Sequence, residues 1–430
     1  MGGKNSTPFI NEEINPIPLV TCCDSFETTR STPSVTSDCS DSSLAVTSSY
    51  CKNPSSLYFL STLSHIYQRG TIGTGGLGET CIVHVDGIEN PCVFKKLIKR
   101  GSSKVIDLSK VSFFLMVELY SNPSCLHRIP RPLFFFNNCS EQVDGVLGYI
   151  TEFCEGGNIQ DFVKYWCIEN VVFLKPLMEE DEEEDSDILD SSDDEDSLDS
   201  LSLNPLKVCS LCVGMIECLD DILIAKPQFI HRNIKPENFL VRIDHESRAC
   251  DIVLDGIGLD SLQEAVALSP ESESYFPFTE SDNPLDRLSL YTTQSWYYYA
   301  PEAFDGVFSQ SSDAYSLGMA MLSIFLQKVP YCGHPILMRS SRPSDFKYVI
   351  EHGMGPKIDH FPIFKSLETM EDGKYLSVYQ CFKGIFREFL NVKPSARLSI
   401  RDARERVQSI KDLLPVLGEG WKFFRPSELK

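Results

Sequence analysis

The alternation of apolar and polar positions predicts a mixed α and β domain over about residues 57–414. Short apolar runs are separated by Gly, Pro and Asn, the residues that most often end strands and helices. No internal repeat is visible in this region, which argues against a solenoid. The predicted elements are two strands around a glycine turn at 71–85, a strand at 91–98, helices at 111–120 and 206–224, and a strand at 239–241.

The pattern stops at both ends of the chain. Residues 1–56 are rich in Ser, Thr, Asn and Pro and have no apolar periodicity, so we predict a disordered arm. We place the domain at 66–412 and a C-terminal tail at 413–430.

Composition and charge narrow the class of protein. The chain has 430 residues, 42% of them apolar, and a net charge of −22. Nucleic acid is therefore excluded as a main partner, because phosphate binding needs clustered Lys and Arg. Sixteen Cys are too sparse for a disulfide scaffold. Neither a signal peptide nor a membrane span is visible, so we expect a reduced, cytoplasmic protein.

Most of the negative charge belongs to one insert, which we place at 178–203. Residues 179–199 hold 14 Asp and Glu and no Lys or Arg. Repulsion between like charges keeps such a run extended, so a solvated, disordered loop is one interpretation. A docking segment for a basic partner is the other. Ser191 and Ser192 each precede an acid by three positions, a pattern that suits phosphorylation by acidophilic kinases.

A glycine-rich turn opens the domain, with glycines at Gly73, Gly75 and Gly78. Glycines let backbone N–H groups approach a phosphate because no Cβ stands in the way. A dinucleotide-binding turn would be followed by a helix. Here the alternating apolar residues that follow predict a strand, so the segment is either a phosphate-binding hairpin or a plain one.

A lysine interrupts the next apolar strand. Lys95 is costly to bury unless it is paired with an acid. Between Lys95 and Glu118 the only other acid is Asp107, so we predict that Glu118 on the following helix is its partner.

The centre of the chain reads Ile-His-Arg-Asn-Ile-Lys-Pro-Glu-Asn-Phe-Leu-Val, between the predicted helix at 206–224 and the strand at 239–241. This segment resembles the catalytic loop of eukaryotic protein kinases. The matching residues are His231, Arg232, Asn233, Lys235, Pro236 and Asn238.

Other motifs follow in the family's order over about residues 66–412. The glycine turn and Lys95 with Glu118 resemble the ATP-binding elements, and residues 148–157 resemble the strand and hinge that hold adenine. Later in the chain, Glu302 matches the Ala-Pro-Glu glutamate, Asp313 the aspartate that anchors the catalytic loop, and Arg397 the partner of that glutamate. The hinge positions are Thr151 as gatekeeper, Glu152 and Cys154.

The resemblance implies an α+β, bilobal protein-kinase fold, with an antiparallel N-lobe at 66–151 and a mainly helical C-lobe at 155–414. It implies ATP and Mg²⁺ as cofactors. Lys95 would contact the α and β phosphates, Lys235 would neutralise the transferred phosphate, and Asn238 would hold magnesium. Lys235 is typical of Ser/Thr kinases. Arg232 would meet a phosphate on the activation segment, with Thr292 and Thr293 as candidates.

Two departures concern the chemistry itself. The family's catalytic Asp is Asn233 here, and an amide does not accept a proton as a carboxylate does. The Asp-Phe-Gly motif is also degraded. If Ile252 and Leu254 point inward, Gly256 takes the place of the magnesium-binding Asp, and Asp255 lies one residue early. Asp255 is then either a turn residue or, through a local bulge, a metal ligand.

Three functions remain open from the sequence. The first is a Ser/Thr-type kinase of reduced activity that acts on a protein substrate of unknown identity. The second is a pseudokinase that serves as a binding or regulatory scaffold. The third is a membrane-tethered acidic interaction protein, because residues 1–6 match the myristoylation pattern with Gly2 as the acceptor. One acyl chain alone would hold a membrane weakly.

Overall fold

The computed structural model describes the following residues: 66–75, 78–97, 103–137, 147–166, 168–169, 202–203, 205–244, 249–257, 296–326, 331, 343–353, 358 and 373–417. The predicted N-terminal arm, Gly2, the acidic run at 179–199, Thr292 and Thr293 lie outside these ranges. The chain divides into two compact units. Unit 1 comprises Met1–Phe113 and Arg131–Phe153, and unit 2 comprises Phe114–Pro130 and Cys154–Lys430.

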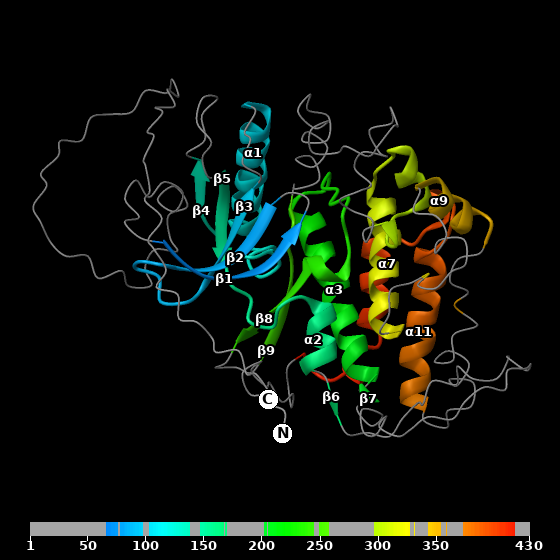
Figure 1. Ribbon diagram of the computed structural model, residues 1–430. Helices are drawn as coiled ribbons and strands as arrows, with labels where there is room; N and C mark the ends of the chain where they lie inside the picture. Colours follow the sequence, from blue (N-terminus) through cyan, green and yellow to red (C-terminus); the bar gives the residue numbers. More distant parts are fainter. Residues whose placement is uncertain are drawn as a thin grey trace, which may run out of the picture. The chain divides into compact units, whose positions relative to one another are not determined.

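Unit 1 is built on an antiparallel sheet, as the sequence predicts. Its strand order is β1-β2-β3-β5-β4 (Figure 1). Alternate residues of β2 are buried, because successive side chains of a strand point to opposite faces. The strands are β1 (Ile66–Gly75), β2 (Gly78–Val85), β3 (Cys92–Leu97), β4 (Pro132–Asn137) and β5 (Leu147–Glu152).

The glycine-rich segment forms a hairpin of β1 and β2, in which Gly75 is opposite Gly78. The two predicted strands and their antiparallel pairing are therefore confirmed. Gly73 has open space around its Cβ position, so no neighbouring atom crowds the backbone there.

One helix, α1 (Ser103–Tyr120), begins eight residues before the predicted start at 111, since the added residues contain neither Gly nor Pro. Its buried Phe113 contacts the rings of Phe135 on β4 and Tyr149 on β5, within unit 1. The residues after Phe113 belong to unit 2. The division at 151–155 that we predicted thus misses the segment Phe114–Pro130, which unit 2 holds.

Unit 2 is mainly helical. Helices α3, α7 and α11 pack side by side, and α12 packs against both α3 and α11 (Figure 1). Helix α7 is buried along almost its whole length, which explains its apolar sequence. The helices are α2 (Ile159–Trp166), α3 (Pro205–Ala225), α7 (Gln310–Leu326), α9 (Pro343–Glu351), α11 (Gly373–Phe389) and α12 (Ile400–Gln408).

The strands β8 (Phe239–Asp244) and β9 (Ala249–Leu254) form an antiparallel hairpin in unit 2. Ile252 and Leu254 are buried, as the sequence predicts for inward-pointing residues, and Val253 between them is buried as well. Strand β9 packs closely against α3 at Gly214. A Cβ at this position would lie 2.7 Å from Ile252 Cγ1, so only glycine leaves room for the strand.

The domain continues beyond residue 412, where we ended it. The Ser210 hydroxyl donates to the Pro415 carbonyl at 2.8 Å, and the Cys250 N–H donates to the Leu417 carbonyl at 3.3 Å. Residues 415–417 are therefore attached to α3 and to β9. The start of the predicted tail belongs to unit 2.

The acidic insert leaves unit 2 and returns to it through a small ribbon. β6 (Ile168–Glu169) pairs antiparallel with β7 (Ser202–Leu203), below α2 and α3 in Figure 1. The last two residues assigned to the insert are thus a strand, and the excursion begins and ends at one place.

Over the described ranges, no helix combines the length and the apolar character that crossing a bilayer requires.

Candidate functional site

The residues that resemble the kinase catalytic loop lie in unit 2, in a loop between α3 and β8 that we call the Asn233 loop (residues 229–238). Asp313 near the start of α7 fixes this loop. Its carboxylate accepts the backbone N–H of His231 at 2.6 Å and that of Arg232 at 2.9 Å. Asp313 is 3% exposed. The anchoring role that the resemblance implies for Asp313 is confirmed by these two bonds.

The anchoring holds Arg232 in an uncommon backbone conformation. Its φ of 68° lies in the left-handed region, which costs a non-glycine residue about 1–3 kcal/mol. The two bonds to Asp313 offset this strain, because they fix the backbone N–H groups of His231 and of Arg232 itself. The Arg232 guanidinium carbon lies 5.6 Å from the centre of the Phe308 ring.

Burial affects the charge of the anchor. Desolvation raises the pKa of Asp313 to about 7, and it outweighs the opposing effects of the two backbone hydrogen bonds and the Arg232 charge. Near neutral pH the anchoring carboxyl is therefore partly protonated.

This shift predicts a pH dependence of stability. Between about pH 4 and pH 7 the folded state keeps a proton on Asp313 that the unfolded state has released. We expect the free energy of unfolding of the wild type, relative to an Asp313→Asn variant, to fall by about 2 kcal/mol from pH 5 to pH 7. Chemical denaturation at several pH values measures it. A difference that rises with pH would contradict the assigned pKa.

Hydrogen bonds connect the rest of the loop internally and to Asp255, the residue that follows β9. The Asn238 Nδ2 donates to the Asn233 carbonyl at 2.7 Å, and the Asp255 N–H donates to the Asn238 carbonyl at 2.8 Å. The imidazole Nε2 of buried His231 lies 2.9 Å from the Asp255 carbonyl oxygen. Asn233, Asn238 and Asp255, which the sequence singled out, are thus brought together in one unit.

Asn233 presents an acceptor to this site. Its Oδ1 is buried and makes no hydrogen bond with any of the described residues. A buried oxygen of this kind favours a donor such as a hydroxyl group. An amide oxygen positions a hydroxyl but does not take its proton, so the arrangement supports orientation and not general-base catalysis.

The residues do not fit a magnesium ion well. Gly256 has φ +80°, and a Cβ built on it would lie 3.4 Å from the Asn238 Nδ2. A side chain at position 256 would therefore lie beside Asn238, and glycine supplies none. Asp255 Oδ1 is buried. No group of three His, Cys, Asp or Glu suited to a metal occurs in the ranges that the structure covers. Mg²⁺ prefers carboxylate oxygens, and this position lacks one.

Lys235 is half-buried and immediately precedes the short 3-10 helix Pro236–Asn238. Its ammonium has neither a hydrogen bond nor a salt bridge to the part of the chain described here. It is therefore available to an anion.

Unit 1 places the predicted ATP-binding residues on neighbouring strands. Lys95 on β3 is opposite Tyr149 on β5, and its ammonium lies 5.7 Å from the centre of that ring. The sequence did not reveal this aromatic neighbour, which only the strand register brings close. Thr151 is 2% exposed, and Glu152 Oε1 accepts the Arg131 N–H at 3.0 Å. Cys154, the first residue of unit 2 after β5, is buried.

Glu118 has an ion-pair partner that we did not predict. Both of its carboxylate oxygens accept from the Lys226 ammonium, at 2.8 and 3.0 Å, and both residues belong to unit 2. The Glu118 side chain is 63% exposed, so this pair contributes little to stability. The expected pair of Lys95 with Glu118 joins the two units and stays a prediction.

The pair of Glu302 with Arg397 is confirmed. Two parallel bonds of 2.5 and 2.8 Å join the guanidinium to the carboxylate, and the Arg397 side chain is 0% exposed. The same guanidinium donates to the carbonyls of Asn391 and Ser311 and lies 5.0 Å from the centre of the Tyr315 ring. This arrangement joins the Ala-Pro-Glu segment to α7 and to the start of α12.

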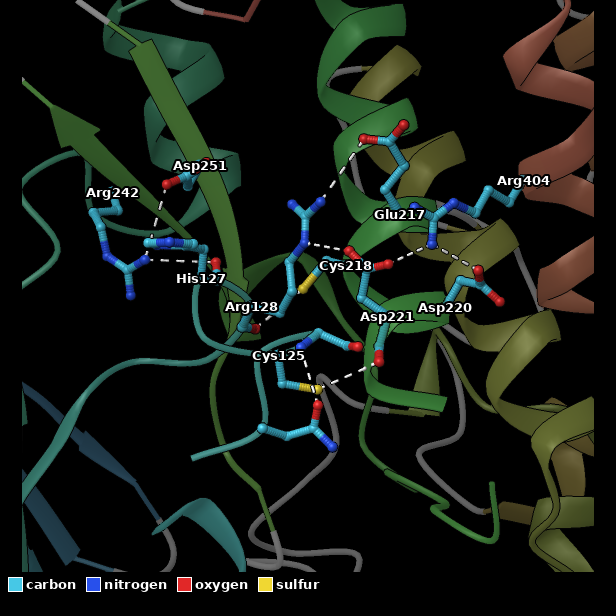
Figure 2. A network of polar contacts seen from close by, with 12 residues as sticks. Cys125, His127, Arg128, Glu217, Cys218, Asp220, Asp221, Arg242, Asp251 and Arg404 are labelled. Atoms are coloured by element: carbon cyan, nitrogen blue, oxygen red, sulfur yellow. Dashed lines mark hydrogen bonds and ion pairs between the residues drawn. The ribbon is translucent and has the colours of Figure 1, made fainter. Parts of the chain in front are cut away.

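A second polar network supports unit 2 and was missed by the sequence analysis (Figure 2). Arg128 Nε donates to Asp221 at 2.6 Å, and Arg404 on α12 donates to Asp220 at 2.8 Å and also to Asp221. Burial raises the pKa of Cys218 to about 12, so its thiol stays protonated and donates to the Arg128 carbonyl. The network ties the segment after α1 to α3 and α12. No local motif marks these residues, since they come from three separate segments.

Comparison with known proteins found no match to this chain, either among protein-family models or among curated proteins.

Proposed function

We propose that this chain is a kinase-type protein that binds ATP and transfers its γ-phosphate only weakly to Ser or Thr of a protein. In this proposal unit 1 is the N-lobe and unit 2 the C-lobe of a protein-kinase-like fold. The observation that carries it is the Asn233 loop, which Asp313 holds through two backbone amides. Strained backbone such as that of Arg232 clusters at functional sites, which supports the proposal.

The ion pair of Glu302 with Arg397 supports the same proposal. Glu302 and Arg397 are 95 positions apart, and the motif order predicted that they meet. Phosphoryl transfer depends on positioning and charge neutralisation more than on covalent chemistry. The groups proposed to neutralise phosphate are Lys95 in unit 1 and Lys235 in unit 2. Asn233 would orient the attacking hydroxyl through its buried Oδ1.

A second candidate, a pseudokinase that binds a nucleotide or a protein without turnover, is favoured by Gly256. The absence of a side chain beside Asn238 removes a metal-binding carboxylate from the place where the resemblance expects one. The two candidates differ in phosphotransfer and share the scaffold.

A radiolabel transfer assay separates the candidates. We expect the full-length wild type to transfer labelled phosphate slowly to a Ser/Thr-containing protein or to itself, and Lys95→Ala to abolish transfer. Lys96→Ala is the matched control, because Lys96 is adjacent on β3 and its ammonium lies 3.9 Å from Glu79. Loss in both variants, or in neither, would contradict the role of Lys95. Binding of ATP without transfer would establish the pseudokinase.

A further inference from the structure

The Asn233 loop differs from a metal-dependent phosphate site in its donor set. The ligand position beside Asn238 is Gly256, and the base position is the neutral Asn233. A divalent ion bridging phosphate and protein would meet amide oxygens there, and hard cations hold these less strongly than carboxylates. We propose that the protein binds the phosphates of a nucleotide directly, without a divalent cation. This inference rests on the ATP binding proposed above.

The charges around the loop support direct contact. Lys235 offers an ammonium without a partner in the described residues, and an ammonium is a common phosphate ligand. Of the nearby acids, Asp313 is committed to the His231 and Arg232 amides. Glu237 Oε2 and Asp255 Oδ1 are buried. The site thus presents the Lys235 ammonium to a phosphate, while one oxygen of each neighbouring carboxylate, Glu237 and Asp255, is turned into the protein.

Gly256 provides a direct test, because there is space for a Cβ and the strain of its positive φ is shared by the two variants compared. The backbone is left-handed, a conformation that Asp and Asn adopt more readily than other non-glycine residues. The nearest atom to the new Cβ lies at 3.4 Å, which is ordinary contact. Gly256→Asp therefore adds one carboxylate beside Asn238, and Gly256→Asn adds the same shape without the charge.

The experiment is calorimetric titration of full-length protein with ATP, once in EDTA and once in excess MgCl₂. For the wild type we expect the two dissociation constants to agree within about threefold. For Gly256→Asp we expect binding in EDTA to weaken by about tenfold or more, because the carboxylate repels phosphate, and MgCl₂ to restore it. Gly256→Asn should behave as the wild type does.

The other possible outcomes of the titration contradict the metal-free binding, the proposed function or the placement of position 256. Wild-type binding that requires MgCl₂ contradicts the inference and leaves the proposed function standing. If that requirement disappears in Asp255→Asn, then Asp255 is the metal ligand. No binding of ATP in either buffer contradicts both the inference and the proposed function. A Gly256→Asp variant that binds equally in both buffers contradicts the placement of position 256 beside the phosphates.

Discussion

If the proposed phosphoryl transfer occurs, we expect the Asn233→Asp variant to be faster than the wild type by about 10²–10⁴-fold, the range that a positioned general base contributes. The variant changes one amide to a carboxylate at a side-chain oxygen that is already buried. The geometry of the loop is retained, because Asp313 fixes it through backbone amides and not through the Asn233 side chain. Initial rates with labelled ATP and a fixed protein acceptor measure the gain.

Two further variants show whether the side chain at position 233 or the metal position limits the rate. Asn233→Ala removes the acceptor and should lower transfer below the wild-type rate. The double variant Asn233→Asp with Gly256→Asp adds the second carboxylate. If Asn233→Asp has no effect and the double variant is faster, the metal position limits the reaction and the base does not.

Breaking the buried pair at Arg397 should produce the largest loss of stability. Arg397→Ala leaves the Glu302 carboxylate, 14% exposed, without its partner, and an uncompensated buried charge costs about 3–5 kcal/mol. We expect the free energy of unfolding to fall by that amount in chemical denaturation.

Arg406→Ala is the matched control for this prediction. Arg406 also makes two bonds to a glutamate, Glu388, at 2.6 and 2.8 Å, but both side chains are about 40% exposed. Exposed pairs contribute about 0–1 kcal/mol, so this variant should be close to the wild type. Equal losses in the two variants would show that burial does not determine the contribution of the Arg397 pair.

The sequence predicted the elements with strong local patterns. The strand pair at 71–85, the helix at 206–224 and the contact of Asp313 with the Asn233 loop are each confirmed by the structure. The pair of Glu302 with Arg397 was predicted because its members stand in motifs that can be located without coordinates. The kinase-type function itself stays a proposal.

What the sequence did not predict depends on distant contacts. Lys226 is an ordinary lysine at the end of α3, and only the fold brings it to Glu118. Tyr149 and Tyr315 stand in no motif that marks a cation contact, yet each lies close to a cation, Lys95 and Arg397 respectively. The boundary at 412 was wrong because Ser210 and Cys250, far back in the chain, bind the backbone of residues 415 and 417.

The ribbon of β6 and β7 has a consequence for how this protein tolerates change. Because Ile168 pairs with Leu203 and Glu169 with Ser202, the two ends of the segment 170–201 are held side by side. Each doubling of such an excursion costs only about 0.6 kcal/mol of closure entropy. This junction is therefore a natural insertion point, where added sequence, including a whole reporter domain, can be accommodated while the helices of unit 2 fold as before.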